Sequence, residues 1–313
     1  MNPVLDRLPI LILEPHNRCN CRCVMCDIWK VTDARELTVI ELQRHVADIE
    51  LLGVEWVVFT GGEPLMHSDL FRLVEMLPPA IRTTLLSTGL LLERNAQLIV
   101  RHIGDVIVSL DGPRAIHDAI RRVPNAFDTL AAGIRAIHRL KPDFPIAARC
   151  TVQALNAGHL RETVGAARDL GLDSISFLAA DVTSTAFNRP LAWPEPRQAK
   201  VAPDLAVLER ELELLIAEYP ANGFVVESPA KLRRIVEHSR SPKAPRCNAP
   251  WVSAVVDASG NVRPCFFHPP LGNTKTDSLR AVLNSSHAVA FRESLDVATN
   301  GVCRQCVCSL YRH

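Results

Sequence analysis

The chain has 313 residues, which is enough for one large domain or for a large domain and a small one. Hydrophobic residues make up 48% of it and charged residues 22%, proportions typical of a folded globular protein and not of a disordered one. The formal net charge is +1, and without a basic excess the composition gives no indication of a nucleic-acid partner.

The first apolar run, Leu8–Leu13, is only six residues long. It is too short for the apolar core of a signal peptide, and no later run reaches the roughly eighteen apolar residues of a membrane span. We therefore expect a cytoplasmic protein without a membrane partner.

Short apolar runs then alternate with helical patterns through two-thirds of the chain. The expected strands are Ile10–Glu14, Trp56–Thr60, Thr83–Ser87, Val106–Leu110, Ala147–Val152 and Ser174–Leu178. The expected helices are Val39–Leu52, Leu70–Leu77, Glu93–His102, Phe127–Leu140 and Leu160–Leu170. The strands lack clean alternation of polar and apolar residues, as in a parallel sheet buried on both faces. The pattern predicts an α/β fold: an open, partial (β/α)6 TIM-like barrel with its active site at the carboxyl ends of the strands.

The composition changes after residue 182. Pro, Ser and Thr are frequent over Thr183–Pro203, a helix is expected over Asp204–Glu218, and prolines recur over Ser239–Pro250. We therefore expect a barrel over 1–182, a linker and helical region over 183–238, and a small cysteine-containing domain over 239–313.

Ten cysteines fall into two groups and one isolated residue. Four lie between Cys19 and Cys26, five lie between Cys247 and Cys308, and Cys150 stands alone in an apolar run. In a reducing compartment, clustered thiols indicate metal ligands and not disulfides. Cys150 is expected to be a small buried apolar residue.

The first cysteine group directly follows the first strand and fits two kinds of site. Cys19, Cys23 and Cys26 have the spacing Cys-x3-Cys-x2-Cys. With Cys21 added, four thiolates could close a zinc or iron–sulfur site. Three thiolates on a cubane would instead leave one iron open to a substrate. Spacing alone leaves both alternatives open.

The second strand ends in a motif that suits a small ligand. Thr60 is followed by Gly61, Gly62, Glu63 and Pro64. A glycine pair lets the backbone approach a ligand closely, and the Glu63 carboxylate could bind an ammonium group.

Together these motifs resemble the radical S-adenosylmethionine (SAM) superfamily. Its three-cysteine motif matches Cys19, Cys23 and Cys26, and its Gly-Gly-Glu motif matches Gly61–Glu63. The resemblance implies a 4Fe–4S cluster on the three cysteines, whose fourth iron binds the amino and carboxylate groups of SAM. It also assigns the SAM amino group to the Gly-Gly-Glu motif. Met25 replaces the aromatic residue that usually precedes the third cysteine near the adenine, and a thioether can fill that space.

A third match follows the fourth expected strand. Ser109-Leu-Asp111-Gly-Pro and His117-Asp-x-x-Arg121 resemble a segment of the superfamily branch that has C-terminal cluster domains. That resemblance places Ser109 and Asp111 near the SAM ribose or carboxylate and makes Arg121 a candidate carboxylate partner. Ser87, in a Ser-Thr-Gly turn similar to the family's Thr-Asn-Gly turn, is assigned to the same cofactor site.

The second cysteine group comprises Cys247, Cys265, Cys303, Cys306 and Cys308. A hairpin with a Gly-containing turn is expected between the first two, and by spacing alone zinc and iron–sulfur suit the group equally well. The order of the cysteines resembles the SPASM and twitch auxiliary-cluster domains of radical SAM enzymes. This implies one auxiliary iron–sulfur cluster, of the 4Fe–4S type, on Cys247, Cys265, Cys303 and Cys306, with Cys308 as the alternative to Cys306.

The resemblance implies an oxidoreductase-type radical SAM enzyme. A one-electron donor such as flavodoxin or ferredoxin would drive reductive cleavage of SAM to a 5′-deoxyadenosyl radical, which abstracts hydrogen from a substrate. We expect a small biosynthetic substrate and a net oxidation or dehydrogenation assisted by the auxiliary cluster. The alternatives are a maturase that oxidises, crosslinks or epimerises a ribosomally made peptide, and a metal-stabilised binding module without SAM chemistry. The sequence does not identify a catalytic base.

Overall fold

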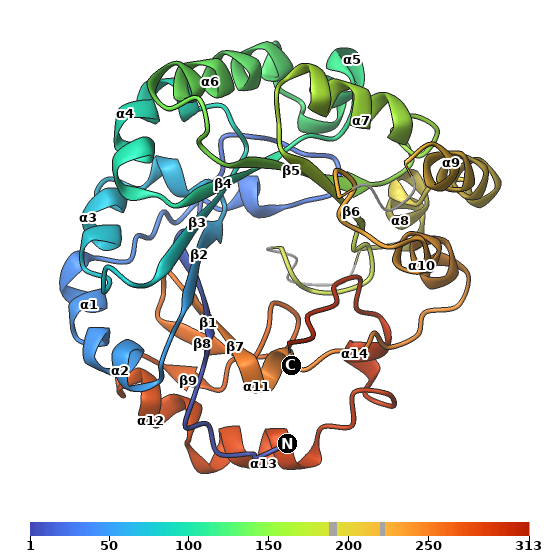
Figure 1. Ribbon diagram of the computed structural model, residues 1–313. Helices are drawn as coiled ribbons and strands as arrows, with labels where there is room; N and C mark the ends of the chain where they lie inside the picture. The colour runs from blue at the N-terminus through green and yellow to red at the C-terminus, as the bar shows by residue number, and fades with distance from the viewer. Residues whose placement is uncertain (188–192, 220–222, 313) are drawn as a thin grey trace.

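The computed structural model describes residues 1–187, 193–219 and 223–312. Six parallel strands curve around a central space, and helices cover their outer face (Figure 1). The strands lie side by side in chain order, which confirms the predicted partial barrel of six β/α units. They are β1 (Ile10–His16), β2 (Trp56–Gly61), β3 (Arg82–Ser87), β4 (Asp105–Ser109), β5 (Ile146–Val152) and β6 (Ser174–Ala179).

The helices of the barrel fill the connections between these strands. They are α1 (Val39–Gln43), α2 (Val46–Leu51), α3 (Leu70–Glu75), α4 (Leu92–His102), α5 (Arg114–Arg121), α6 (Ala126–Leu140) and α7 (Leu160–Asp169), with short 3-10 helices η1 (Ile28–Lys30) and η2 (Pro64–Met66). The single helix predicted over Val39–Leu52 is wrong, because the chain turns at Arg44 and His45. There the His45 N–H donates to Leu42 O three residues back, which tightens the backbone and ends α1.

Three further helices follow β6 along the chain. They are α8 (Glu195–Val201), α9 (Leu205–Glu218) and α10 (Pro229–Arg240). The Asp204 side chain caps α9 by accepting from the N–H groups of Ala206 and Val207, so the predicted start of this helix is confirmed. Figure 1 shows α9 and α10 on the outside of the barrel beside β6.

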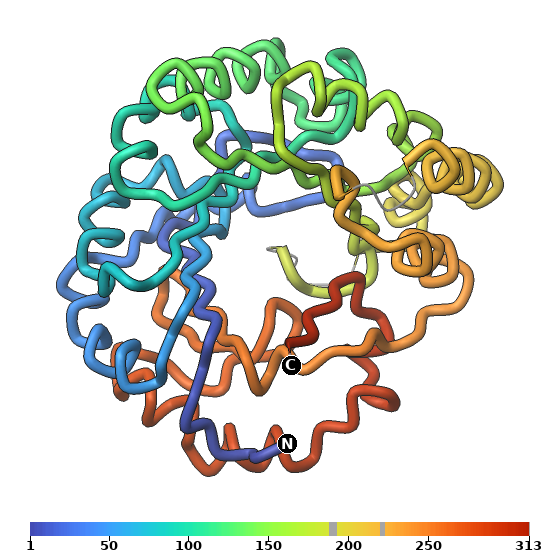
Figure 2. Tube along the Cα trace, in the orientation of Figure 1, coloured from blue at the N-terminus to red at the C-terminus, as the bar shows by residue number. Residues whose placement is uncertain are grey.

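The C-terminal segment extends the sheet of the barrel. Its elements are α11 (Ala249–Val252), β7 (Ser253–Asp257), β8 (Asn261–Arg263), β9 (Gly272–Asn273), α12 (Leu279–Leu283), α13 (Ser286–Ser294) and α14 (Gly301–Arg304). Strands β7 and β8 form the predicted antiparallel hairpin. Unlike a separate module, β7 also pairs in parallel with β1, so that one nine-stranded sheet runs from β6 to β9. Figure 2 shows the last residues of the chain crossing the open side of the barrel.

The two faces of the parallel strands have different roles. Outward-pointing side chains such as Leu11, Phe59 and Leu85 are almost fully buried and form the core beneath the helices. Inward-pointing side chains such as Ile12 and Val58 line a central cavity. Within the described residues, no helix combines the length and the apolar character that a membrane crossing requires.

Glu14 is a titratable residue on β1, where β1 pairs with β7. Its strand partner is Asp257 on β7, whose carboxylate pairs with Arg263 at 2.9 Å. Burial raises the pKa of Glu14 to about 7, the Arg263 charge opposes this rise, and the Asp257 charge adds to it. Because the pKa of Glu14 is higher in the folded state than in the unfolded state, ionisation of the carboxyl costs stability as the pH rises through 7.

We therefore expect E14Q to be more stable than the wild type at pH 8.5 by roughly 2 kcal/mol, with a much smaller difference at pH 5. Anaerobic denaturant unfolding at the two pH values measures the difference in the free energy of unfolding. A difference that is equal at both pH values would show that Glu14 ionises as freely in the folded protein as in the unfolded chain.

Candidate functional site

The four N-terminal cysteines lie together on the loop that leaves the carboxyl end of β1. Cys19, Cys21, Cys23 and Cys26 belong to one cluster, in which Met25 is also buried. The Cys21 thiol hydrogen-bonds to both Cys19 and Cys23. The loop therefore brings the predicted ligands together, and thiolates are the donor type that an iron–sulfur cluster needs.

The carboxyl end of β2 holds this cysteine loop through its backbone. The Glu63 N–H donates to Arg18 O at 2.8 Å, and the Gly62 N–H donates to His16 O at 3.2 Å. A Cβ atom on Gly62 would lie 1.9 Å from Arg18 O, which is far inside contact distance. Only glycine allows the two backbones to approach so closely, so the glycine pair positions the residue that precedes Cys19.

The end of α5 holds the other side of the loop. The N–H groups of Arg22 and Val24 donate to the carbonyl oxygens of Arg121 and Ile120, both at 3.0 Å. The buried Arg121 guanidinium also reaches Cys23 Sγ at 3.5 Å. A hydrogen bond from Cys21 and the positive charge of Arg121 lower the pKa of the Cys23 thiol, although burial raises it. This environment favours the thiolate that binds iron.

Asp111 connects this loop to the neighbouring strand β5. Its fully buried carboxylate pairs with Arg121 at 2.5 Å and accepts from the Thr151 N–H at 2.9 Å. The Asn156 amide donates to Asp111 O at 2.9 Å. In this structure Arg121 and Asp111 bind each other, and their predicted contacts with SAM stay predictions.

Glu63 is the centre of a second buried network. Its carboxylate accepts from the Leu65 N–H, from the hydroxyl groups of Ser87 and Thr88, and from the Thr88 N–H at 2.7 Å. Burial raises its pKa, while these donors act in the opposite direction. Glu63 and Ser87 thus fix the ends of β2 and β3 to each other beside the cysteine loop.

Polar groups at the strand ends suit a bound SAM molecule. Gln153, directly after β5, is fully buried, and its amide N and O have no hydrogen-bond partner among the described residues. The neighbouring Ala154 N–H donates to Val201 O, and Val201 packs in the cluster of the N-terminal cysteines. An unsatisfied buried amide indicates a missing polar partner, so these residues fit the predicted cofactor. Ser109 ends β4 nearby, and sequence analysis did not find Gln153.

A segment after β6 is fastened over the cysteine loop through Asp27. The indole of Trp193 donates to Asp27 Oδ2 at 2.8 Å, and the Arg197 guanidinium binds the same carboxylate at 2.7 and 2.9 Å. Arg197 also stacks on Trp193, with 3.7 Å from its central carbon to the ring centroid. Trp193 also packs in the cluster of the N-terminal cysteines, so this contact holds the segment against the cysteine loop. Sequence analysis missed it, since the partners lie more than 160 residues apart.

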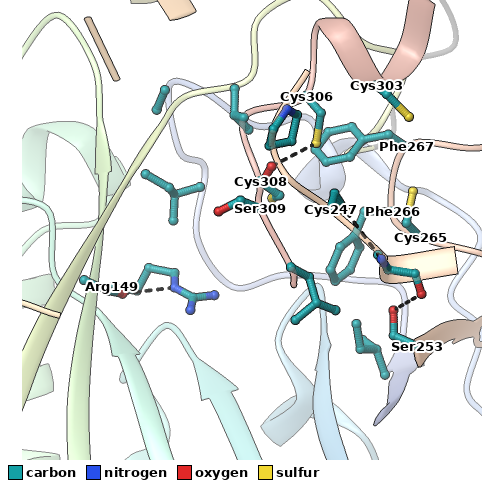
Figure 3. Close-up of a pocket in the computed structure, with 18 of the residues that line it drawn as sticks. Arg149, Cys247, Ser253, Cys265, Phe266, Phe267, Cys303, Cys306, Cys308 and Ser309 are labelled. Carbon is teal, nitrogen blue, oxygen red and sulfur yellow. Dashed lines mark hydrogen bonds between the residues drawn. The ribbon is translucent and has the colours of Figure 1, made fainter. Parts of the chain in front are cut away.

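The five C-terminal cysteines gather around one cavity (Figure 3). They come from the start of α11, the end of β8, α14 and the chain that follows it, and all five line the cavity: Cys247, Cys265, Cys303, Cys306 and Cys308. The Cys306 thiol donates to Cys308 O at 3.4 Å, so the two residues lie together and both stay alternatives for the fourth ligand.

The surroundings of Cys265 and Cys303 favour the protonated form of each thiol, so a bound cluster would have to displace their protons. Burial raises the pKa of Cys265 and of Cys303 to about 11, and neighbouring cysteines add to both shifts. In the described ranges, no three His, Cys, Asp or Glu side chains converge as ligands of a single metal ion would. The buried His268, which sequence analysis missed, lies 3.4 Å from Cys303 Sγ.

The cavity between the barrel and these cysteines has a volume of about 300 Å³. One wall is the inner face of the strands, with Ile12, Val58 and Arg149, and the other contains the cysteines with Phe266 and Phe267. Thr60 and Ala179 line it at the carboxyl ends of β2 and β6, towards the N-terminal cysteine loop. A molecule in this cavity would lie between the two cysteine groups.

Comparisons with known proteins agree with this layout. The family model of the radical SAM superfamily matches residues 13–164, and that of the SPASM iron–sulfur cluster-binding domain matches residues 247–307. Among curated proteins, the AdoMet-dependent heme synthase of Methanosarcina barkeri is 27% identical over 89% of this chain and 82% of its own length. The Fe-coproporphyrin III synthase of the same organism is 28% identical over 71% of this chain and 56% of its own.

A bacteriocin biosynthesis protein and a solved SAM-bound structure also match. The antilisterial bacteriocin subtilosin biosynthesis protein AlbA of Bacillus subtilis is 25% identical over 87% of this chain and 58% of its own length. Among solved structures, Streptococcus suis SuiB bound to S-adenosylmethionine superposes with a TM-score of 0.71 at 16% identity, covering 99% of this chain and 74% of that one. At that identity the likeness establishes the fold alone.

Proposed function

Because the chain belongs to the radical SAM superfamily and has a C-terminal SPASM domain, we propose that it reductively cleaves SAM and oxidises a small biosynthetic molecule. The family resemblance stated from the motifs is thereby confirmed, and with it the requirement for a 4Fe–4S cluster, SAM and auxiliary iron–sulfur binding. The cavity between the two cysteine groups is the observation that carries the proposal.

When bound at the first cluster, SAM would supply the radical chemistry that removes hydrogen from the substrate. The residues of the chain orient and shield this chemistry. Cys19, Cys23 and Cys26 would hold the first cluster, and Gly62 allows their loop to lie against β2. Trp193 and Arg197 close the loop from the other side and keep water from the cluster ligands.

The remaining predicted ligands are assigned to the second site. Cys247, Cys265, Cys303 and Cys306 would hold one auxiliary cluster beside the cavity. There the substrate radical that remains after hydrogen abstraction would pass one electron to the cluster, while a base takes up the proton that is released with it. The electron that reduces the first cluster before SAM cleavage would come from a flavodoxin or ferredoxin. We also propose a cytoplasmic setting, because clustered thiols in a reducing compartment are available as metal ligands. We propose that residues 1–182 form the radical SAM barrel, residues 183–238 a linker and helical region, and residues 239–313 the auxiliary-cluster domain.

A small-molecule substrate is favoured over a peptide by the size of the cavity. At about 300 Å³ it lies at the lower end of the range for small-molecule sites. Two of the similar curated proteins are named as synthases of heme and Fe-coproporphyrin III. The peptide-maturase alternative draws on AlbA and on the structure of SuiB with its precursor peptide SuiA.

The first test is SAM cleavage. We expect the anaerobically reconstituted protein, reduced with dithionite, to convert SAM into equal amounts of 5′-deoxyadenosine and methionine. Chromatography of the quenched reaction measures both products. A protein that retains its iron but forms no 5′-deoxyadenosine would support the binding-module alternative and contradict the proposal.

A further inference from the structure

Arg149 is an unusual residue for its position in the sheet. It lies near the middle of β5, between β4 and β6, where parallel strands are normally apolar on both faces. Its side chain is exposed, whereas the other residues of β5 are buried or half-buried. The exposure is towards the inside of the barrel, because Arg149 lines the central cavity (Figure 3).

The guanidinium is only partly satisfied by the protein. Its Nε donates to Ser176 Oγ on β6 at 3.3 Å. Within the described part of the chain, no carboxylate lies within ion-pair distance of Arg149, although a planar guanidinium has five donors in a fork that matches a carboxylate. The remaining donors face the cavity, as the close-up shows.

One other cation of the cavity is paired with a carboxylate, which Arg149 also influences electrostatically. Lys231 pairs with Glu227 at 3.8 Å, and Glu227 also accepts from the Phe177 N–H at 2.9 Å. Arg234 donates to a backbone carbonyl, that of Lys243, at 3.5 Å. The described lining of the cavity thus has more cationic than anionic side chains, and neither Arg149 nor Arg234 has a carboxylate of the described residues within ion-pair distance. Of the two, Arg149 lies on the sheet itself, at the inner wall of the barrel.

The rest of the wall indicates what kind of ligand would supply Arg149 with a partner. Ile12, Val58, Phe266 and Phe267 give the cavity large apolar surfaces. A ligand that fits both features has an apolar body and one anionic group. The strand register places Arg149 opposite Ser109, a predicted SAM-site residue, so the anchored ligand would lie beside that site.

We propose that Arg149 binds a carboxylate of the substrate and thereby fixes the substrate between the SAM site and the C-terminal cysteines. This inference rests on the proposed function for its setting, but the recognition chemistry follows from the cavity itself. It narrows the substrate to an apolar molecule that bears a carboxylate. The competing role is electrostatic: Arg149 also acts on the nearby Cys308 thiol and could serve only as a counter-charge to a cluster.

The test compares two probes that differ only in charge, 4-phenylbutyrate and 4-phenylbutanol. Anaerobic titration calorimetry on the reconstituted full-length protein measures their affinities. We expect the acid to bind wild-type protein more tightly than the alcohol, and R149Q to weaken the acid by about 10- to 100-fold while leaving the alcohol within about 2-fold. R149K, which keeps the charge but loses the fork, should fall between the two.

K231Q is the matched control, because it removes another cation of the same cavity. We expect it to change the affinity for the acid by less than about 3-fold. Equal binding of both probes to the wild type, no binding of the acid, or equal losses in R149Q and K231Q would each overturn the proposal. So would an R149Q protein whose cluster absorption spectrum changes while its affinity for the acid does not.

Two measurements keep this result separate from the proposed function. Iron content and circular dichroism establish that each variant is folded and loaded. Cleavage of SAM by the wild-type preparation tests the radical chemistry independently of the probes. If SAM is cleaved but the probes do not distinguish the acid, only the assignment of Arg149 fails; if SAM is not cleaved, the proposed function fails.

Discussion

Replacing Cys23 with Ala is expected to abolish formation of 5′-deoxyadenosine, with a loss of at least about 100-fold, to the level of the assay background. Cys23 is buried, accepts a hydrogen bond from Arg121, and lies in the cluster formed by the N-terminal cysteines. Without its thiolate, only two of the three predicted ligands remain. C19A and C26A should behave alike, and iron analysis should show that each variant loses the first cluster's iron.

The matched controls for this experiment are Cys21 and Cys150, two of the three cysteines that are not assigned as ligands. Cys21 touches Cys19 and Cys23, and Cys150 is fully buried in β5. We expect C21A and C150A to keep the iron and to form 5′-deoxyadenosine. A C21A protein that loses the cluster, together with a C23A protein that keeps it, would replace the predicted ligand set by one that includes Cys21.

Replacing Gly62 with Ala should have a comparably large effect without touching a ligand. The added methyl group would lie 1.9 Å from Arg18 O, so the backbone that leads into Cys19 has to move. Both contacting groups are backbone and cannot rotate away. We expect a loss of about 3 kcal/mol or more in the free energy of unfolding, together with poor iron incorporation.

Gly165 provides the opposite case in the same protein. It lies within α7, and a Cβ atom built there meets nothing within 4 Å. G165A should stabilise the protein by about 0.5–1 kcal/mol, because alanine is favoured over glycine inside a helix. Denaturant unfolding and iron analysis of both variants, side by side, measure the contrast. Similar losses in G62A and G165A would show that the close approach at Gly62 is unimportant.

Much of the scaffold could be predicted because local patterns and global fold agree. The buried strand β2 begins with four apolar residues in succession, and the barrel helices follow the 3.6-residue period. The two cysteine groups could be assigned because ligand spacing is visible within a few residues. The break at His45 was missed because a helical period continues across a tight turn.

What could not be predicted depends on contacts between distant parts of the chain. Trp193 and Asp27 meet only in the folded structure, and nothing near either residue indicates its partner. Pairing of β7 with β1 was likewise invisible, since a short apolar strand does not reveal its neighbour. Arg149 could have been noticed in the sequence, because a single arginine within a mostly apolar buried strand is uncommon and indicates a functional role.

The pairing of β7 with β1 has a consequence for how the protein can be cut or recombined. β1 is apolar and carries the cysteine loop at its end, and β7 occupies the whole of its outer edge from Ile10 to Glu14. A chain severed before Ser253 would leave a row of bare backbone donors and acceptors along β1, a template on which other molecules could polymerise. The C-terminal segment that contains β7 thus protects the edge of β1. A C-terminal segment taken from another protein would therefore need a strand that pairs with β1, in addition to the ligand cysteines.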